Sequence, residues 1–169
     1  MLSVRAAEPA DALAVARVHV RSWQVDYRGL LPGDYLDRLR PEERAGRYTF
    51  GQISAAGPET IVAVDDDAIC GFATIGPAWG PDQPTGGELL ALYVDPDWWR
   101  RRIGRRLLNE ARRQLSERGF TEAILWVLVG NLRGELFYQA DGWLPDGTRR
   151  EDQVWGARVD EVRYGRALP

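Results

Sequence analysis

The chain has 169 residues, a mass of 19.0 kDa and a net charge of −3, and 44% of its residues are hydrophobic, which suits one globular domain. It contains no apolar run of about 18 residues and no apolar start typical of a signal peptide, so we expect a cytoplasmic protein without a membrane partner. All 22 basic residues are arginine, and there is one histidine, His19, and one cysteine, Cys70. This composition excludes Walker-type and Schiff-base lysines, an HExxH metal site and a cysteine zinc cluster.

Because arginine cannot act as a base at ordinary pH, proton transfer must come from carboxylates, tyrosines or the single histidine and cysteine. We therefore expect a bound cofactor to carry the chemistry, with the protein supplying position and charge.

Apolar spacing predicts the elements of the N-terminal half. They are, in order, a strand at Ser3–Ala6, a helix from about Pro9 to Trp23, short helices at Tyr35–Arg40 and Pro41–Phe50, and strands at Thr60–Val64 and Ile69–Ile75. The acidic run Asp65–Asp67 is interpreted as a hairpin turn and not as a metal site, since no fourth ligand is suggested. Gly80–Gly87 is the most loop-like stretch but separates no second domain, so we predict one domain over residues 1–169.

The C-terminal half alternates strands and helices. We expect a strand at Glu88–Val94, a helix from Ile103 to Gly119, a buried strand at Ala123–Val129, a helix capped by Asn131 that ends before Gly142, and two strands, the second at Val159–Ala167. This order predicts an α/β sandwich with a mixed sheet.

Positive charge is concentrated in one segment, Arg100–Arg118, which carries +6, so the remaining residues carry −9. Basic residues at a helix N-terminus oppose the helix dipole, and a bound anion would reverse that cost because the free backbone N–H groups point at it. We therefore interpret Arg100–Arg106 as a phosphate site. Arg112, Arg113 and Arg118 are expected to form a solvated face.

The segment Leu92–Leu108 (LYVDPDWWRRRIGRRLL) resembles the acetyl-CoA motif of GNAT-superfamily N-acetyltransferases, in which a strand ending in V-x-P precedes Q/R-x-x-G-x-G/A and a helix. Three further regions resemble the family, in family order. His19–Trp23 and Tyr27–Pro32 resemble its opening, and Val162–Tyr164 resembles its ending. Between them, the family's second signature is resembled by Leu125–Leu128, Asn131, Phe137-Tyr138 and Asp141–Trp143. The chain departs from the pattern at Trp99, at Arg102 in place of the first glycine, and at Gly134 in place of an alanine.

The resemblance implies a single-domain α+β fold whose mixed, mostly antiparallel sheet splays at the fourth strand, with helices on both faces and coenzyme A in the gap. It implies acetyl-CoA as cosubstrate and no metal. The implied cofactor-binding residues are Leu92, Tyr93 and Val94, through backbone groups freed by a β-bulge, and Arg100, Arg101, Arg102, Ile103, Gly104, Arg105, Asn131 and Tyr138. For the strand residues, the alternative is a fully paired strand.

Two residues are candidates for proton transfer. Glu88 matches the position of the catalytic glutamate in histone-acetylating members of the family, and strand alternation would place it on one side with Leu90, Leu92 and Val94. The alternatives are an ordinary strand-end carboxylate and a base made of water molecules. Tyr138 lies two helical turns after Asn131 and is the candidate acid for the leaving thiolate, the alternative being a ring that only packs beside Phe137.

The expected reaction is direct attack of a primary amine, on a small molecule or a peptide, at the thioester. Trp23, Tyr27 and Tyr35 are candidates for holding a cationic amine, and the −9 outside the arginine segment favours a cationic acceptor such as a polyamine or a basic peptide end. Two alternatives stay open: a nucleic-acid-binding module using Arg100–Arg118, against which the pI of 5.3 argues, and an acyl-CoA-binding fold without transfer. We expect no nucleic-acid partner, and a homodimer stays open.

Overall fold

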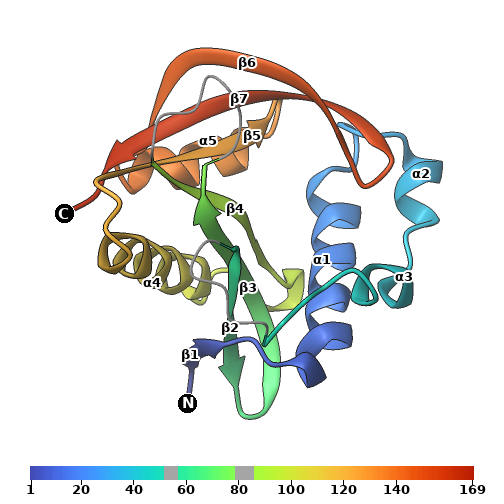
Figure 1. Ribbon diagram of the computed structural model, residues 1–169. Coiled ribbons are helices and arrows are strands. Elements are labelled where there is room, and N and C mark those ends of the chain that lie inside the picture. The colour runs from blue at the N-terminus through green and yellow to red at the C-terminus, as the bar shows by residue number, and fades with distance from the viewer. Residues whose placement is uncertain (52–56, 79–85) are drawn as a thin grey trace.

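The computed structural model describes residues 1–51, 57–78 and 86–169 and contains one seven-stranded mixed sheet (Figure 1). Its spatial order is β1-β2-β3-β4-β5-β7-β6, and among the described strands the β4–β5 pair alone is parallel. The strands are β1 (Ser3–Ala6), β2 (Glu59–Asp65), β3 (Ala68–Pro77), β4 (Gly87–Val94), β5 (Glu122–Leu128), β6 (Leu144–Val154) and β7 (Ala157–Ala167). The predicted mixed, mostly antiparallel sheet is confirmed.

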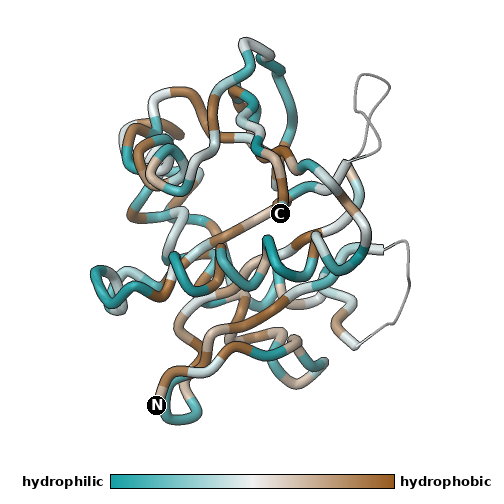
Figure 2. The backbone as a smooth tube through the Cα atoms, turned by 90° about the vertical axis from the view of Figure 1, so that its left-hand side faces the viewer, coloured by the Kyte–Doolittle hydropathy of each residue, from teal (hydrophilic) through white to brown (hydrophobic). Residues whose placement is uncertain are grey.

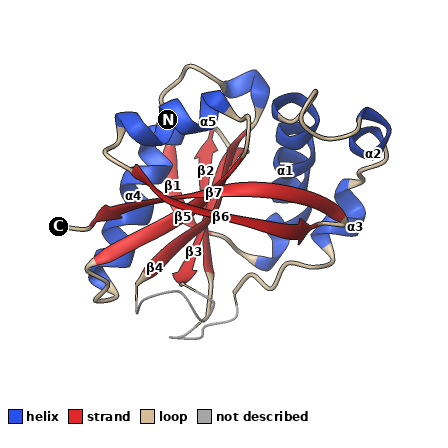
Figure 3. Cartoon of the chain, turned by 90° about the horizontal axis from the view of Figure 1, so that it is seen from above, coloured by secondary structure: helices blue, strands red, loops and turns tan. Residues whose placement is uncertain are grey.

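Helices cover both faces of this sheet, as expected (Figure 3). They are α1 (Ala12–Asp26), α2 (Gly33–Asp37), α3 (Pro41–Ala45), α4 (Ile103–Glu117) and α5 (Leu132–Ala140), with 3-10 turns at Pro9–Asp11 and Pro96–Trp98. In α4 one stripe is buried, and hydrophilic residues occupy the rest of the helix, which crosses the molecule in Figure 2. The buried stripe is Ile103, Leu107, Leu108, Ala111 and Leu115.

Several predicted boundaries were wrong. The first helix continues past Trp23 to Asp26, and the predicted helix Pro41–Phe50 ends at Ala45, followed by Gly46. Beyond that glycine, the Tyr48 and Phe50 rings stack 4.7 Å apart and pack with the hydrophobic cluster beside α1, so tertiary packing replaces the helix there. The first of the two short helices is Gly33–Asp37 instead of Tyr35–Arg40. Most of the loop predicted at Gly80–Gly87, residues 80–85, lies outside the described residues.

Two hairpin turns use left-handed backbone. Asp66 and Asp67 connect β2 to β3 with φ of 45° and 69°, and Trp155 and Gly156 connect β6 to β7 with φ of 52° and 76°. Positive φ at both central residues is typical of the two-residue turn that matches strand twist. The interpretation of Asp65–Asp67 as a turn therefore holds.

The sheet splays between β4 and β5. These strands pair at Gly87, Glu88 and Leu89 and at no described residue beyond them. On the other side of β4 the register with β3 shifts, because Leu89 faces Ile75 and Ala91 faces Thr74, which leaves Leu90 as an extra residue. The bulge therefore lies at Leu90, before the expected Leu92–Val94.

The bulge reverses the predicted side-chain alternation. Leu89, Leu92 and Val94 pack with the cluster under α4, whereas Ala91 and Tyr93 pack on the opposite side of the sheet near α1. Glu88 lies on the Tyr93 side, so the prediction that Glu88, Leu90, Leu92 and Val94 share a side was wrong. A one-residue insertion exchanges the two faces of a strand. Within the described chain, no helix is long and apolar enough to cross a membrane.

Candidate active site

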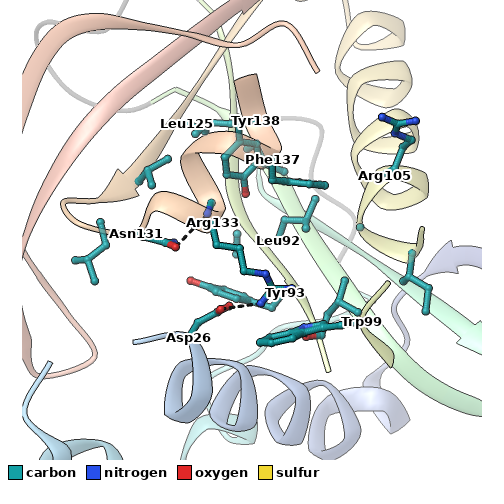
Figure 4. A pocket seen from close by; sticks show the side chains of 18 of the residues that line it. Asp26, Leu92, Tyr93, Trp99, Arg105, Leu125, Asn131, Arg133, Phe137 and Tyr138 are labelled. Carbon is teal, nitrogen blue, oxygen red and sulfur yellow. Dashed lines mark hydrogen bonds and ion pairs between the residues drawn. The ribbon is translucent and has the colours of Figure 1, made fainter. Parts of the chain in front are cut away.

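A cleft of about 390 Å³ occupies the gap where β4 and β5 separate (Figure 4). Its walls come from β4, β5, the start of α4, α5 and the end of α1. Of the residues singled out from sequence, the cleft brings together Tyr27, Leu92, Tyr93, Val94, Arg100, Arg102, Ile103, Gly104, Arg105, Asn131 and Tyr138. Residues that are far apart in the sequence thus meet in one place.

The loop between β4 and α4 is held by its own side chains. Asp95 accepts a hydrogen bond from the backbone N–H of Asp97 at 2.9 Å, and the Trp99 indole N–H donates to the Val94 carbonyl at 2.8 Å. Arg100 and Arg102 adopt φ of 65° and 63°, a left-handed conformation that disfavours residues with a Cβ. This explains why a glycine suits the position of Arg102, and it shows that the chain keeps the loop geometry with an arginine there.

The arginines of this segment divide into two groups. Arg100, Arg102 and Arg105 are exposed at the cleft, and no carboxylate of the described residues lies within ion-pair distance of them. Further along α4, Arg112 pairs with Asp141 at 2.9 Å and Arg113 pairs with Glu110 at 2.6 Å. Within this segment, the positive charge that no described carboxylate pairs with therefore concentrates at the helix start, where backbone N–H groups can also bind an anion.

Arg101 and Gly104 have different surroundings. The Arg101 guanidinium lies 4.7 Å from the Trp98 ring centroid, and Arg101 does not line the cleft. A Cβ built on Gly104 would lie 3.3 Å from the Phe137 ring, so glycine permits α4 to approach α5 closely. This contact narrows the cleft between the two helices.

Helix α5 brings Asn131 and Tyr138 to the cleft. The Asn131 side chain accepts a hydrogen bond from the Gly134 backbone N–H at 3.1 Å and so caps the helix. A Cβ on Gly134 would lie 2.6 Å from the Asn131 amide nitrogen, so the absence of the usual alanine makes room for this cap. Burial raises the pKa of Tyr138 above its ordinary value, which keeps the hydroxyl protonated at neutral pH.

The remaining candidates lie apart from the cleft lining. Glu88 is 6% exposed, and burial raises its pKa to about 7, with Arg150 acting in the opposite direction. Trp23 is buried against Trp155, and the Tyr35 hydroxyl donates to the Trp155 carbonyl. Of the three candidates for holding an amine, Tyr27 lines the cleft and Trp23 and Tyr35 do not, so the amine-holding role stays a prediction.

Sequence reasoning missed a contact across the cleft. Arg133 from α5 forms an ion pair with Asp26 of α1 at 2.9 Å, and its guanidinium carbon lies 3.3 Å from the Trp99 ring centroid (Figure 4). No periodicity links these three positions, so only the fold reveals the contact. Trp126 also lines the cleft, and it was missed because the apolar stretch Ala123–Val129 indicated only a buried strand.

The chain matches the Acetyltransferase (GNAT) family over residues 19–143. It is 31% identical to the uncharacterized N-acetyltransferase YuaI of Bacillus subtilis over 98% of this chain and 92% of that protein. It is 24% identical to the spermidine N(1)-acetyltransferase of Thermoplasma acidophilum, over 90% of this chain and 94% of that one. The crystal structure of the PaiA N-acetyltransferase of Thermoplasma acidophilum in complex with coenzyme A shares the fold, with a TM-score of 0.69, 20% identity and coverage of 96% and 98%. The splayed sheet, the loop before α4 and these matches together place this chain in the GNAT family of acetyltransferases.

Proposed function

We propose that the cleft binds acetyl-CoA and that the protein transfers the acetyl group to a primary amine of a small molecule or a peptide by direct attack. Acetyl-CoA-dependent acetyl transfer is the general activity of the family. The observation that carries the proposal is the set of arginines at the start of α4 that have no ion-pair partner among the described residues and line the same cleft as Asn131 and Tyr138.

Arg100, Arg102, Arg105 and the first backbone N–H groups of α4 would hold the diphosphate of coenzyme A. Asn131 and the edge of β4 that β5 leaves unpaired after Leu89 would bind the pantetheine arm and the acetyl oxygen. When bound, acetyl-CoA supplies the acetyl group as a thioester. These residues hold the thioester at the splay, where an amine can reach it from the Tyr93 side of the sheet.

Two side chains would move protons in the transfer. The Glu88 carboxylate, directly or through water, accepts the proton that the attacking amine loses. The Tyr138 hydroxyl donates a proton to the departing thiolate and regains one from solvent. The products are the acetylated amine and free coenzyme A.

Cofactor binding is tested by comparing two double variants in the arginine-rich segment Arg100–Arg118. Arg100→Gln with Arg105→Gln should weaken acetyl-CoA affinity by about 10- to 100-fold, because each removes a charge-assisted hydrogen bond to phosphate. Arg112→Gln with Arg113→Gln removes the same charge from residues that already have protein partners, and should change affinity by less than about threefold. Calorimetric titration measures both. Equal losses would mean that the arginines act only as a diffuse positive field.

Catalysis is tested at Tyr138. Tyr138→Phe removes only the hydroxyl and should lower kcat by about 10- to 100-fold while leaving acetyl-CoA affinity unchanged, because the proton is donated only as the thiolate leaves. Release of free coenzyme A reports turnover. Wild-type turnover in the variant, with chemistry rate-limiting, would remove Tyr138 from the mechanism, and absence of turnover in the wild type with normal binding would favour a fold that binds acyl-CoA without transfer.

A further inference from the structure

On the Tyr93 side of the sheet, one group of polar side chains lies beside the cleft. Pairing across the strands puts Glu88 opposite Ile124, Arg163 opposite Trp126, and Glu161 opposite Leu128 and Arg150. Paired residues share a face, so these side chains project from the same side of β4, β5, β7 and β6. Trp126 also lines the cleft, which joins this group to the proposed thioester position.

Most charges in the group are already paired. Arg150 binds Glu161 at 3.0 Å, and Arg163 binds Asp146 at 2.6 Å. The Arg150 guanidinium lies 4.0 Å from the Trp126 ring centroid, and that of Arg163 lies 5.8 Å from it. The two arginines therefore frame the indole ring.

Three functional groups of this set have no hydrogen-bond or ion-pair partner among the described residues. Glu88 is 6% exposed, and its carboxylate has no ion-pair or hydrogen-bond partner among the described residues. The indole N–H of Trp126 and the Nη1 group of Arg163 are buried, and neither finds an acceptor in the described part of the chain. A buried donor without an acceptor is costly, so the Trp126 and Arg163 donors point to a ligand that supplies an acceptor.

We propose, resting on the function proposed above, that Glu88, Trp126 and Arg163 form the acceptor subsite and that the acceptor is a small amine carrying a carboxylate, such as a free amino acid. The ammonium group binds at Glu88 before it loses its proton, and the carboxylate accepts hydrogen bonds from Trp126 and Arg163. Trp126 and Arg163 face each other on adjacent strands, and Glu88 lies one pair further along the same face.

The leftover groups disfavour a polyamine as acceptor. A polyamine offers donors only, so it would satisfy Glu88 but would leave the indole N–H and the Arg163 Nη1 group unpaired and would add a positive charge beside two arginines. An acceptor with a carboxylate satisfies all three groups. A site built to bind a polar group discriminates strongly against analogues that lack it.

The test is a panel of acceptors: free α-, β- and γ-amino acids, the matching amines without the carboxylate, and spermidine, each assayed by coenzyme A release. We expect at least one amino acid to exceed its matching amine in kcat/KM by tenfold or more. Arg163→Gln should reduce kcat/KM for that amino acid by about 10- to 100-fold and for the matching amine by less than about threefold. Trp126→Phe keeps an aromatic ring but removes the indole N–H, and should give a smaller loss of kcat/KM for the amino acid.

Controls separate this inference from the function on which it rests. Arg158→Gln removes an exposed arginine of β7 that pairs with Glu151, and it should change kcat/KM neither for the amino acid nor for the matching amine. Arg163→Lys serves if the glutamine variant does not fold, and should reduce the amino-acid preference in the same direction. If wild-type protein does not bind acetyl-CoA, the proposed function fails and the inference falls with it. If it binds acetyl-CoA but prefers the amines or spermidine, uses no amino acid, or loses both activities equally in Arg163→Gln, only the inference is overturned.

Discussion

Arg102 allows a direct test of the loop before α4. It adopts φ of 63° at the residue that precedes the helix, where a Cβ is unfavourable. We compare Arg102→Ala with Arg102→Gly, because both remove the same side chain and charge and only the second removes the Cβ. As a matched control we use Arg106→Ala and Arg106→Gly, since Arg106 is an exposed arginine inside the first turns of the same helix.

The left-handed conformation costs a residue with a Cβ about 1–2 kcal/mol, and glycine loses about 0.5–1 kcal/mol more chain entropy on folding. Arg102→Gly should therefore be more stable than Arg102→Ala by about 0.5–1 kcal/mol. At Arg106 the order reverses, because glycine in a helix is about 1 kcal/mol less favourable than alanine. For a chain of this length these differences correspond to about 1–4 °C in Tm, with opposite sign at the two positions.

Thermal unfolding without cofactor, followed by circular dichroism, measures all four variants. Removing one arginine charge near the N-terminus of α4 should act similarly at both positions, so the comparison isolates the backbone. Equal Tm values for the two Arg102 variants, or alanine more stable than glycine there, would refute the left-handed geometry and with it the explanation of the missing glycine.

Two further predictions concern charged side chains. Burial raises the pKa of Glu88 to about 7 from an ordinary 4.5, so the stability that its protonated form provides is fully present below about pH 4.5 and is lost as pH rises through about 7. Relative to the wild type, Glu88→Gln should therefore raise the free energy of unfolding by about 1–3 kcal/mol more at pH 8.5 than at pH 4.5, as measured by urea unfolding. Asp26→Asn and Arg133→Gln should show a coupling energy of about 0.5–1 kcal/mol in a double-mutant cycle, since the pair is only partly buried; additive effects would mean that the contact across the cleft contributes nothing to stability.

The sequence by itself determined the features that depend on local pattern. The sequence predicted a helix that begins at Ile103, where α4 begins, and the acidic run Asp65–Asp67 identified a tight turn. The short motifs and their order along the chain identified the family, because each motif consists of residues close together in the sequence.

Only the tertiary structure decided which residues share a face and which meet across the cleft. A single extra residue at Leu90 reverses the side-chain directions of β4, so periodicity placed Glu88 with the wrong neighbours. The leftover donors of Trp126 and Arg163 could not be found from sequence, because a hydrogen-bond partner is missing only when every neighbouring strand is in place. For the same reason no local pattern brings Arg133 to Asp26, since strands β2 to β5 lie between the two residues in the sequence and the ion pair forms across the cleft.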